Sequence, residues 1–488
     1  MKEGKIFFKY LRKAGRHLRA KTIMIILDGF DYTFIRKNID RLVFFKQLYE
    51  KGYLCSLESV VPADSIPSWT TIYTGLNPAE HGVLESIDYL DFKNKVKGNY
   101  SVIQGNSFWD VLGNQGKKVF IFNPFMAYPA WNVNGLMISG PVFEGGDVST
   151  NRPDLIELSS MPSIGGMVDH PTDKEMKKFY EETMELSQKQ FDTFHKYFKR
   201  DKYDFAFLGI TTPDRMQHFL WRYTDPDDCT YPKNGRLKNS ILQMYQFMEK
   251  NVKKIMDSYG EEYNVIVISD HGHGRRCEKT FYINQWLISQ GFIKDKNKKQ
   301  RVIEFTKNSA FQFLATFHIV ESGTKFFKKF RFAHKVKNAD YVFSDKKEKV
   351  YAPKFDGCNP FGGIIVTRTE FTSDEEYEMM RQKIIDGLLE VKDNGKPIMI
   401  WVKRREEIYT GAKVSNYPDI VYQMKPEYGV DRGLFGKRIF GINAMHEVLS
   451  GGHQLLGVIM GNREDVKDVR SVLNIYEYII KISGGTEG

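Results

Sequence analysis

The chain has 488 residues, enough for one large domain with insertions or for two to three ordinary domains. With 41% hydrophobic and 14% aromatic residues it is globular rather than disordered, and its apolar runs fall short of the roughly 18 residues that a bilayer-spanning helix needs. The net charge of +10 favours anionic partners, such as phosphorylated small molecules, nucleic acid or an anionic membrane surface, without distinguishing among them.

The first 21 residues, MKEGKIFFKYLRKAGRHLRAK, form a basic segment. It lacks the continuous apolar stretch and the small-residue cleavage site of a secretory signal, so we expect a cytoplasmic protein. Basic and apolar residues are interleaved in FFKYLRKAGRHLRAK, as in an amphipathic surface helix. Peripheral contact between this segment and an anionic membrane therefore stays open.

The four cysteines are spaced far apart along the chain, at Cys55, Cys229, Cys277 and Cys358. No pair has the spacing of a disulfide framework or of a cysteine metal cluster. This usage also indicates an intracellular compartment, where thiols stay reduced.

Five short, nearly uninterrupted apolar runs are typical of buried parallel strands. They are TIMIILD (22–28), KVFIFN (118–123), YDFAFLGI (203–210), NVIVISD (264–270) and LLGVIMG (455–461). Amphipathic helical patterns lie between them at residues 173–200 and 239–260. The alternation predicts an α/β domain with a largely parallel sheet that helices cover on both faces.

The region from about Arg275 to Ser450 interrupts this alternation with aromatic and basic residues, and the basic residues are densest between Lys294 and Lys349. We interpret it as an insertion or cap before the last strand, with the charges on a solvated surface. The predicted organisation is a basic N-terminal segment (1–21), a catalytic core (22–285 and 445–488), and an inserted or cap region with additional core elements (286–444).

Oxygen and imidazole groups lie at or near the ends of the predicted strands, where α/β sheets gather their functional groups. These residues are Asp28 in LDGFD, Ser65 in DSIPSW, Asp214 and His218 in PDRMQH, Asp270 and His271 in SDHGHG, and His453 in SGGHQ. Carboxylates and neutral imidazoles suit a borderline-hard divalent cation. The set is large enough to bind two ions.

Some of these residues also have ordinary structural interpretations. Asp214 and His218 share a helix face at a spacing of four, but such pairs are common by chance. An aspartate after a first strand, such as Asp28, can cap a helix, and His453 can be a loop histidine. Ser65 can be either a helix cap or a nucleophile.

The pair Asp270 and His271 has the most specific pattern. Neighbouring polar residues directly after a buried strand can both reach a crevice, and Gly272 and Gly274 leave backbone room for a ligand. A packing role explains an Asp-His-Gly-His-Gly run poorly. We therefore predict that this pair binds a ligand.

Taken in order, ILDG, the S-x-P run followed by TGLNPAEHG, D-x-x-x-H, SDHG and a late G-x-H resemble the alkaline phosphatase superfamily. Within it they resemble the type I phosphodiesterase and nucleotide pyrophosphatase branch, together with the phosphohydrolase or phosphomutase group beside that branch. The resemblance extends from about Thr22 to Gly461. It implies an alkaline-phosphatase-like three-layer α/β sandwich with a mostly parallel central sheet and an inserted cap segment.

The resemblance also implies two divalent metal ions, zinc first, with manganese or iron as alternatives. One ion is then held by Asp214, His218 and His453, and the other by Asp28, Asp270 and His271 together with the oxygen of Ser65. Ser65 becomes the nucleophile and forms a phosphoserine intermediate; the family often has threonine at this position.

Nucleotide pyrophosphatases carry an asparagine shortly after the HG element, where it helps to hold a phosphate oxygen. This chain has HGVLESIDYLD there, without an asparagine. Asn106 and Asn123 are therefore substrate-binding candidates by residue type alone. The oxyanion-stabilising residue stays unassigned at this point.

These features predict a metal-dependent phosphodiesterase or nucleotide pyrophosphatase that acts on a nucleotide, a nucleotide-sugar or another phosphodiester, with no sequence-specific nucleic-acid partner. A phosphomonoesterase or phosphomutase of the same superfamily stays open, because the same metals and serine serve both reactions. A sulfatase is disfavoured, because Trp69 stands where the sulfatase signature expects arginine. A non-catalytic anion-binding protein is disfavoured by the intact set of ligands.

Overall fold

The computed structural model describes residues 20–83, 100–141, 147–154, 171, 174–232, 235, 237–294, 302, 305–306, 309–310, 313, 349–353, 360–434 and 437–486. Nearly all of the basic N-terminal segment and most of the basic stretch 294–349 lie outside these residues. The chain divides into two compact units. The first comprises Met1–Thr224, Asn234–Gly274 and His453–Gly488, and the second Asp225–Lys233 and Arg275–Gly452. The predicted core limits at residues 285 and 445 stay a prediction, and the unit limits lie at Gly274 and His453.

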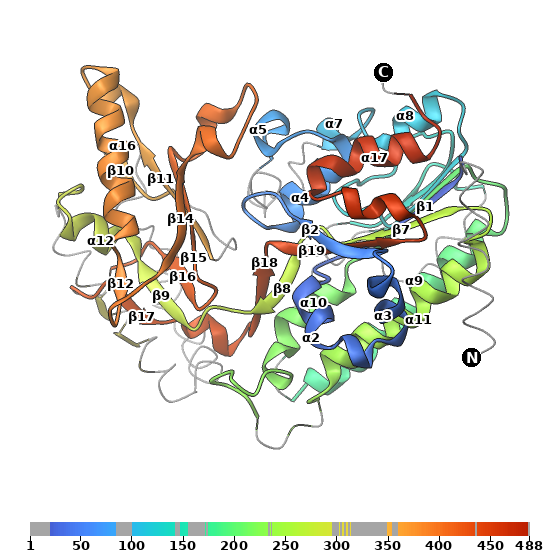
Figure 1. Ribbon diagram of the computed structural model, residues 1–488, viewed down its shortest axis with the longest axis horizontal. Helices are drawn as coiled ribbons and strands as arrows, with labels where there is room; N and C mark the ends of the chain where they lie inside the picture. The colour runs from blue at the N-terminus through green and yellow to red at the C-terminus, as the bar shows by residue number, and fades with distance from the viewer. Residues whose placement is uncertain are drawn as a thin grey trace. The chain divides into compact units, whose positions relative to one another are not determined.

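An eight-stranded sheet forms the centre of the first unit (Figure 1). In spatial order its strands are β2 (Leu54–Glu58), β19 (Leu456–Gly461), β7 (Asn264–Ile268), β1 (Thr22–Leu27), β6 (Phe205–Ile210), β3 (Val119–Phe122), β4 (Gly135–Ser139) and β5 (Ser149–Thr150). All five predicted strands are present. The mixed α/β fold with a mostly parallel sheet is thus confirmed.

The strand β19 corrects one expectation, because it runs antiparallel to both of its neighbours, β2 and β7. The strands β7, β1, β6, β3 and β4 are parallel to one another. An apolar run that is buried on both faces has the same composition in either direction, so its sequence does not encode its orientation. The reversal matters for the site, because it places the start of β19, next to His453, at the edge where β1 and β7 end.

Helices cover both faces of this sheet (Figure 1). One face carries α4 (Ser65–Thr74), α8 (Phe108–Asn114) and α17 (Ile475–Ile482), and the short helices α5 (Pro78–His81) and α7 (Tyr100–Ile103) adjoin α4 or follow it in the chain. The other face carries α2 (Tyr32–Lys37), α3 (Val43–Glu50), α9 (Met176–Phe198), α10 (Thr212–Leu220) and α11 (Ser240–Tyr259). The predicted helices at 173–200 and 239–260 correspond to α9 and α11.

The period-2 geometry of the strands assigns alternate side chains to the two helical layers. On one face Met24 and Ile26 of β1 join a core with Trp69 of α4, which is fully buried. On the other face Phe120 of β3 stacks on Phe194 of α9, with 5.3 Å between ring centroids. Replacing a buried tryptophan such as Trp69 with alanine costs about 3–5 kcal/mol, so this packing holds α4 firmly against the sheet.

The described residues of the second unit include two small sheets and the helices α12 (Ile283–Ser289) and α16 (Asp374–Leu389). One sheet has the order β10 (Val350–Tyr351), β11 (Phe361–Val366), β15 (Ile420–Met424), β14 (Met399–Arg404), and the other has the order β16 (Tyr428–Asp431), β9 (Lys279–Tyr282), β17 (Phe440–Ile442). Two further strand pairs join β12 (Lys392–Asp393) with β13 (Lys396–Pro397), and β8 (Gly272–Arg275) with β18 (Gly451–Gln454).

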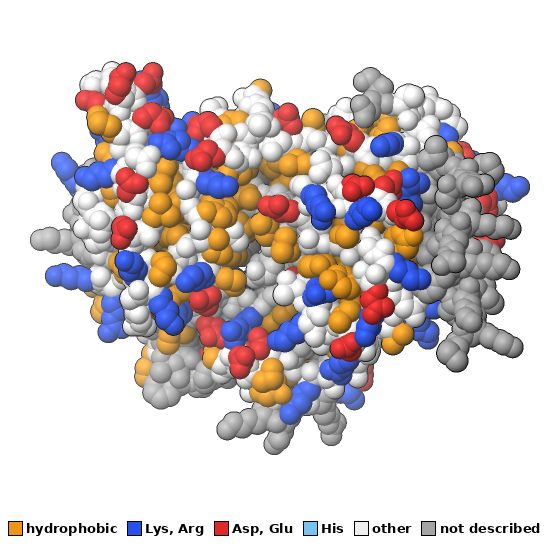
Figure 2. Space-filling view, viewed as in Figure 1, with side chains coloured by type: hydrophobic (Ala, Val, Ile, Leu, Met, Phe, Trp, Pro, Cys, Tyr) orange, Lys and Arg blue, Asp and Glu red, His pale blue; other side chains and the backbone are white. Residues whose placement is uncertain are grey.

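Among the described residues, no helix combines the length and the apolar character that crossing a bilayer requires. On the face drawn in Figure 2, Lys and Arg side chains are interspersed with Asp and Glu side chains. The net positive charge therefore does not gather into one basic patch on that face.

Candidate active site

The end of β1 places Asp28 at the carboxyl edge of the sheet. The Asp28 N–H still donates to the carbonyl of Ile210 (3.0 Å), and the Gly29 N–H donates to Asp270 Oδ1 (3.1 Å). Gly29 has a φ of +66°, and a Cβ there would lie 3.0 Å from Asp214 Oδ1. A glycine is thus required at this position both by its conformation and by the close approach of a carboxylate.

The helix α4 begins at Ser65, with Asp64 as its N-cap: the Asp64 side chain accepts a hydrogen bond from the Ile66 N–H (3.1 Å). Pro67 is tolerated in the first turn of this helix, because the N–H groups there need no helical partner. Asp64 rather than Ser65 is the cap, so the helix-cap interpretation of Ser65 is wrong and its hydroxyl is left for another role.

The first cluster comprises Asp28, Ser65, Asp270 and His271, and we call it the Ser65 cluster. Ser65 Oγ lies 3.0 Å from His271 Nε2 and 3.3 Å from Asp28 Oδ1. His271 Nε2 lies 3.2 Å from Asp270 Oδ2 and 3.7 Å from Asp28 Oδ1. Side chains from two distant parts of the sequence, Asp28 and His271, thus contact one hydroxyl.

The His271 ring is oriented by its other nitrogen, because Nδ1 lies 2.9 Å from the carbonyl of Gly272. With the proton on Nδ1, this contact is a hydrogen bond that leaves the Nε2 lone pair facing the cluster. Burial lowers the pKa of His271, which keeps the imidazole neutral at pH 7. A neutral imidazole is the form that binds a metal.

Two carboxylates of the Ser65 cluster are buried together, because Asp28 is 3% exposed and Asp270 is fully buried. Burial, reinforced by the charge of Asp270, raises the pKa of Asp28 well above its ordinary value. Two neighbouring buried carboxylates cannot both ionise without a compensating positive charge. The cluster is therefore electrostatically incomplete on its own.

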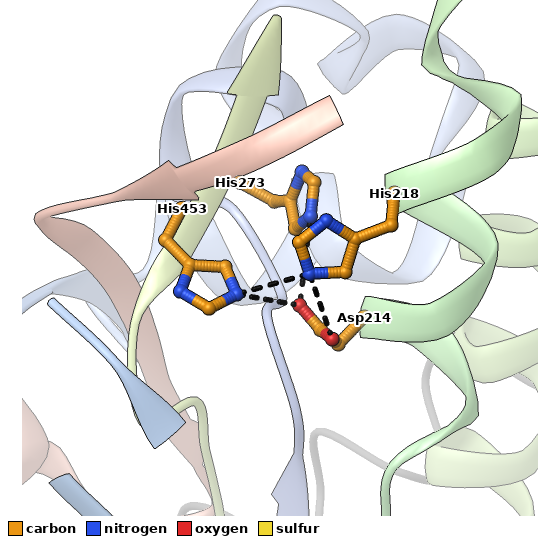
Figure 3. Close-up of side chains that lie close together, drawn as sticks. All are labelled: Asp214, His218, His273 and His453. Atoms are coloured by element: carbon orange, nitrogen blue, oxygen red, sulfur yellow. Dashed lines mark hydrogen bonds and ion pairs between the residues drawn. The ribbon is translucent and has the colours of Figure 1, made fainter. Parts of the chain in front are cut away.

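The second cluster, the Asp214 cluster, comprises Asp214, His218, His273 and His453 (Figure 3). Asp214 and His218 lie on α10, where the predicted helical spacing of four puts His218 Nε2 3.3 Å from Asp214 Oδ2. His453 Nε2 lies 3.4 Å from Asp214 Oδ1 and 3.1 Å from His218 Nε2. The imidazoles converge on one carboxylate.

His453 is oriented in the same way as His271. Its Nδ1 lies 3.1 Å from the carbonyl of Ala63, so Nε2 faces Asp214. Burial alone would lower the pKa of His453, but the adjacent Asp214 carboxylate outweighs it and raises the pKa to about 9. Burial raises the pKa of Asp214, and the opposing effects of His218 and His453 hold it well below the ordinary range.

His273 is a member of this cluster that the sequence interpretation missed. Its Nε2 lies 3.5 Å from Asp214 Oδ1, and its ring is 1% exposed and stacks on Trp221. The signal was present in the sequence, because His273 is two residues beyond His271 in SDHGHG. Side chains at i and i+2 of an extended segment point the same way, so both histidines can face the site.

The two clusters are adjacent, since the rings of His271 and His453 stack with their centroids 4.0 Å apart. One ring belongs to each cluster. The seven residues predicted from sequence are therefore brought together in one place, at the carboxyl edge of the sheet of the first unit. Their binding of metal stays a prediction.

Unpaired buried polar atoms in the two clusters also indicate that these side chains suit divalent cations, without reference to any protein family. Asp270 Oδ2, Asp214 Oδ1 and both ring nitrogens of His273 are buried without a hydrogen-bond partner among the described residues. Buried polar atoms are nearly always paired, and unpaired ones indicate a missing ligand, ion or water. Neutral imidazoles and carboxylates converging from several elements are what a zinc-type ion requires.

The two asparagines that were candidates by residue type lie in other contacts. Asn106 is exposed and donates its amide to the carbonyl of Val102 (3.1 Å). Asn123 is buried and donates to the carbonyl of Gly209 (2.8 Å). Among the hydrogen bonds of the described residues, neither amide reaches Ser65, and their role in substrate binding stays a prediction.

The family described as "Type I phosphodiesterase / nucleotide pyrophosphatase" matches residues 22–437. The chain belongs to this family. The match confirms the resemblance to the nucleotide pyrophosphatase branch of the alkaline phosphatase superfamily, a group of phosphoric ester hydrolases.

Individual members of the family share about a quarter or less of their aligned residues with this chain. Human ectonucleotide pyrophosphatase/phosphodiesterase family member 1 is 24% identical over 285 residues, which cover 54% of this chain and 25% of the human protein. Family member 3 from Bos taurus is 21% identical over 262 residues, covering 50% of this chain and 24% of that protein. The chain thus spans about a quarter of the length of these relatives.

Among solved structures, the fold is similar to phosphonoacetate hydrolase from Sinorhizobium meliloti 1021 in complex with phosphonoformate. The TM-score is 0.50 with 14% sequence identity, and the alignment covers 95% of this chain and 96% of that one. At this identity the likeness shows the shared fold.

Proposed function

We propose that this protein is a metal-dependent phosphodiesterase of the nucleotide pyrophosphatase type, with Ser65 as its nucleophile. The observation that carries the proposal is the position of the Ser65 hydroxyl, 3.0 Å from His271 Nε2 and 3.3 Å from Asp28 Oδ1 at the start of α4. A serine at the edge of a metal-type donor set is placed for attack on phosphorus rather than for capping a helix.

Two divalent cations, zinc first with manganese or iron as alternatives, are proposed as cofactors. Asp28, Asp270 and His271 would hold one beside Ser65, and Asp214, His218 and His453 would hold the other. When bound, the cations supply a lowered pKa for oxygen nucleophiles and positive charge that offsets the charge developing on phosphate.

The residues of the chain then have separate tasks. The N-terminal N–H groups of α4 and its dipole favour a phosphate next to Ser65. A hydrogen bond of 2.7 Å from Ser68 Oγ to the Asp270 carbonyl fixes this helix end against the end of β7. The nucleophile is thereby held on a rigid element.

The reaction proceeds in two displacements. The Ser65 oxygen, having lost its proton to solvent, forms a bond to phosphorus, and the bond to the leaving oxygen breaks with its electron pair. Water then attacks the phosphoserine, and its departing proton accompanies the release of Ser65. Each step inverts phosphorus, so the configuration is retained overall.

The substrate is proposed to be a phosphorylated small molecule with a diester or pyrophosphate linkage, such as a nucleotide or nucleotide-sugar. A cytoplasmic location and peripheral contact of the basic N-terminus with an anionic membrane remain parts of the proposal. The residues that carry the membrane contact lie almost wholly outside the described ones.

The test compares hydrolysis of bis-nitrophenyl phosphate with that of mono-nitrophenyl phosphate by the zinc-loaded protein. A higher rate on the diester supports the proposal, and a higher rate on the monoester favours a phosphomonoesterase or phosphomutase instead. The Ser65→Ala variant should lose activity by at least about a thousandfold while keeping its metal. The matched Ser65→Thr variant keeps a β-hydroxyl and should retain activity, and undiminished turnover in Ser65→Ala would remove Ser65 from the mechanism.

A further inference from the structure

A third group of metal-type side chains lies in the second unit, apart from the two clusters of the candidate active site. It comprises Asp228, Cys229, Glu278 and His446, and we call it the Asp228 cluster. One ligand atom from each of the four residues lies within 4.8 Å of the others. The residues come from three separate stretches of the chain, so their convergence is a product of folding.

The centre of the cluster is a buried carboxylate and imidazole. His446 Nε2 lies 3.0 Å from both Asp228 Oδ1 and Asp228 Oδ2. Asp228 is 4% and His446 2% exposed. A tetrahedral site with metal–ligand bonds of about 2.0–2.3 Å separates its ligand atoms by about 3.3–3.8 Å. The 3.0 Å spacing of the Asp228 and His446 atoms is close to that range, and side-chain rotation has to bring the other ligand atoms, now within 4.8 Å, into it.

The surrounding contacts orient these ligands. The N–H and the hydroxyl of Thr230 both donate to Asp228 Oδ1, at 2.8 and 2.6 Å, which leaves Oδ2 free of them. On the other side, the Asn443 N–H donates to the carbonyl of Glu278 (2.8 Å), which ties the turn carrying His446 to the segment carrying Glu278. Support of this kind from outside the ligand set is typical of metal sites.

The charge balance also favours a cation. Two carboxylates and a thiol face one imidazole, and the Cys229 N–H donates to Glu278 Oε1 (3.3 Å). The neighbouring cation is Arg275, whose guanidinium lies 3.5 Å from Glu278 and 3.7 Å from Asp225. Arg275 thus pairs with carboxylates at the exposed edge of the cluster. Asp228, which is buried, has no Lys or Arg side chain among its described contacts.

A buried ion pair between Asp228 and His446 accounts for two members of the cluster, and Arg275 and the Cys229 N–H account for Glu278. Neither set of contacts uses the thiol of Cys229, which lies within ligand distance of the other three members. A thiolate and an imidazole together select zinc-type ions over magnesium or calcium. The exposed Cys229 at the rim gives such an ion an entry path from solvent.

We propose that Asp228, Cys229, Glu278 and His446 form a structural site for one zinc-type divalent cation. The ion links the 225–233 segment to the chain before β9 and to the turn after β17. A site with four protein ligands has no open position for substrate, so its role is to stabilise the fold. The wide spacing of the cysteines argues against a metal site built from several cysteines. The proposed site uses only Cys229, and its other ligands are two carboxylates and an imidazole.

The test uses the full chain, stripped of metal with a chelator and titrated with Co²⁺. A thiolate ligand gives Co²⁺ an intense near-ultraviolet charge-transfer absorption, which imidazole and carboxylate ligands do not give. The wild-type protein should develop this absorption, and Cys229→Ser should lose at least about nine tenths of it. His446→Gln should weaken Co²⁺ binding at this absorption by at least about tenfold.

Cys55→Ser is the matched control, because Cys55 lies outside the cluster, and it should keep the full absorption. Circular dichroism of Cys229→Ser verifies folding, which a change at an exposed side chain should preserve. Wild-type protein without the absorption would overturn the proposal and leave only the Asp228–His446 ion pair, and so would equal absorption in Cys229→Ser. The candidate active site has no cysteine among its predicted ligands, so the His453→Ala variant should keep the absorption. The Co²⁺ result is therefore independent of whether the protein proves to be a hydrolase.

Discussion

His218 and His453, 235 residues apart in the sequence, point the same ring nitrogen at each other with 3.1 Å between their Nε2 atoms. The same two nitrogens lie 3.3 and 3.4 Å from oxygens of Asp214. One proton between the two Nε2 atoms makes this contact a hydrogen bond, and without that proton both nitrogens can donate a lone pair to one cation. The relationship therefore fits the proposed metal site at the Asp214 cluster.

Replacing His453 with alanine should remove one metal from the protein. The variant is expected to bind one equivalent of zinc fewer than wild type and to lose at least about a hundredfold in diester hydrolysis, because a ligand matters more than the outer-shell groups that shift affinity by about 10–100-fold. Elemental analysis after gel filtration measures the metal. His195→Gln, at a buried histidine outside the clusters, is the control, and an unchanged zinc content in His453→Ala would contradict the assignment.

The Asp28→Asn substitution should raise the melting temperature in the absence of metal and lower it in the presence of zinc. In chelator, the variant should melt about 2–8 °C higher than wild type, because one of two buried, mutually repelling carboxylates is neutralised. In zinc, it should melt lower than wild type, because a ligand has been lost. Thermal melts in the two buffers measure this, and a variant that is less stable in both would show that Asp28 has a purely structural role.

His273 should act as a positioning residue for Asp214. His273→Gln is expected to lower zinc affinity at the Asp214 cluster by about 10–100-fold, with a smaller change in the Ser65 cluster. Competition with a chromophoric chelator measures the affinity. If kcat recovers fully at saturating zinc, His273 acts through the metal; a loss of kcat that zinc does not restore would instead place it in contact with the reacting groups.

The sheet was predictable because β1, β3, β6 and β7 are buried on both faces, which leaves uninterrupted apolar runs in the sequence. The strand β2 (Leu54–Glu58) is fully buried only at Leu54 and Leu57, has no such run and was missed. The predicted direction of β19 was wrong for a different reason. The orientation of a strand is set by the edge at which the chain enters the sheet, and the local apolar pattern does not encode that edge.

The candidate site was predictable to the extent that motifs follow strand ends. Asp28 directly follows β1, and Asp270 follows β7 after one residue, so the parallel neighbouring strands bring them together. His453 lies on the short strand β18, just before β19, and reaches the same edge because β19 runs antiparallel to β7. The Asp228 cluster was beyond prediction, because its ligands come from a loop, a strand entry and a short turn whose meeting has no periodic pattern.

His195 on α9 should make the free energy of unfolding decrease as the pH falls. Burial, with a smaller contribution from the Lys254 charge, lowers its pKa from an ordinary value of about 6.5 to about 4. The unfolded chain then binds the extra proton between pH 6.5 and 4, so the contribution of His195 is complete above pH 6.5 and is lost as pH falls toward 4.

His195→Gln removes this titration. The stability difference between wild type and variant should shift by at most about 3 kcal/mol between pH 7 and pH 4.5, with wild type losing more on acidification. Urea unfolding at both pH values measures it. A difference that is independent of pH would show that His195 titrates normally.

Anomalous X-ray diffraction at the zinc edge, from crystals of the zinc-loaded protein, locates the bound metals and their ligands independently of activity. We expect one zinc within about 2.3 Å of ligand atoms of Asp214, His218 and His453, and a second within the same distance of Asp28, Asp270 and His271, with Ser65 Oγ next to it. Anomalous peaks absent from both clusters, or a second zinc out of reach of the Ser65 hydroxyl, would contradict it.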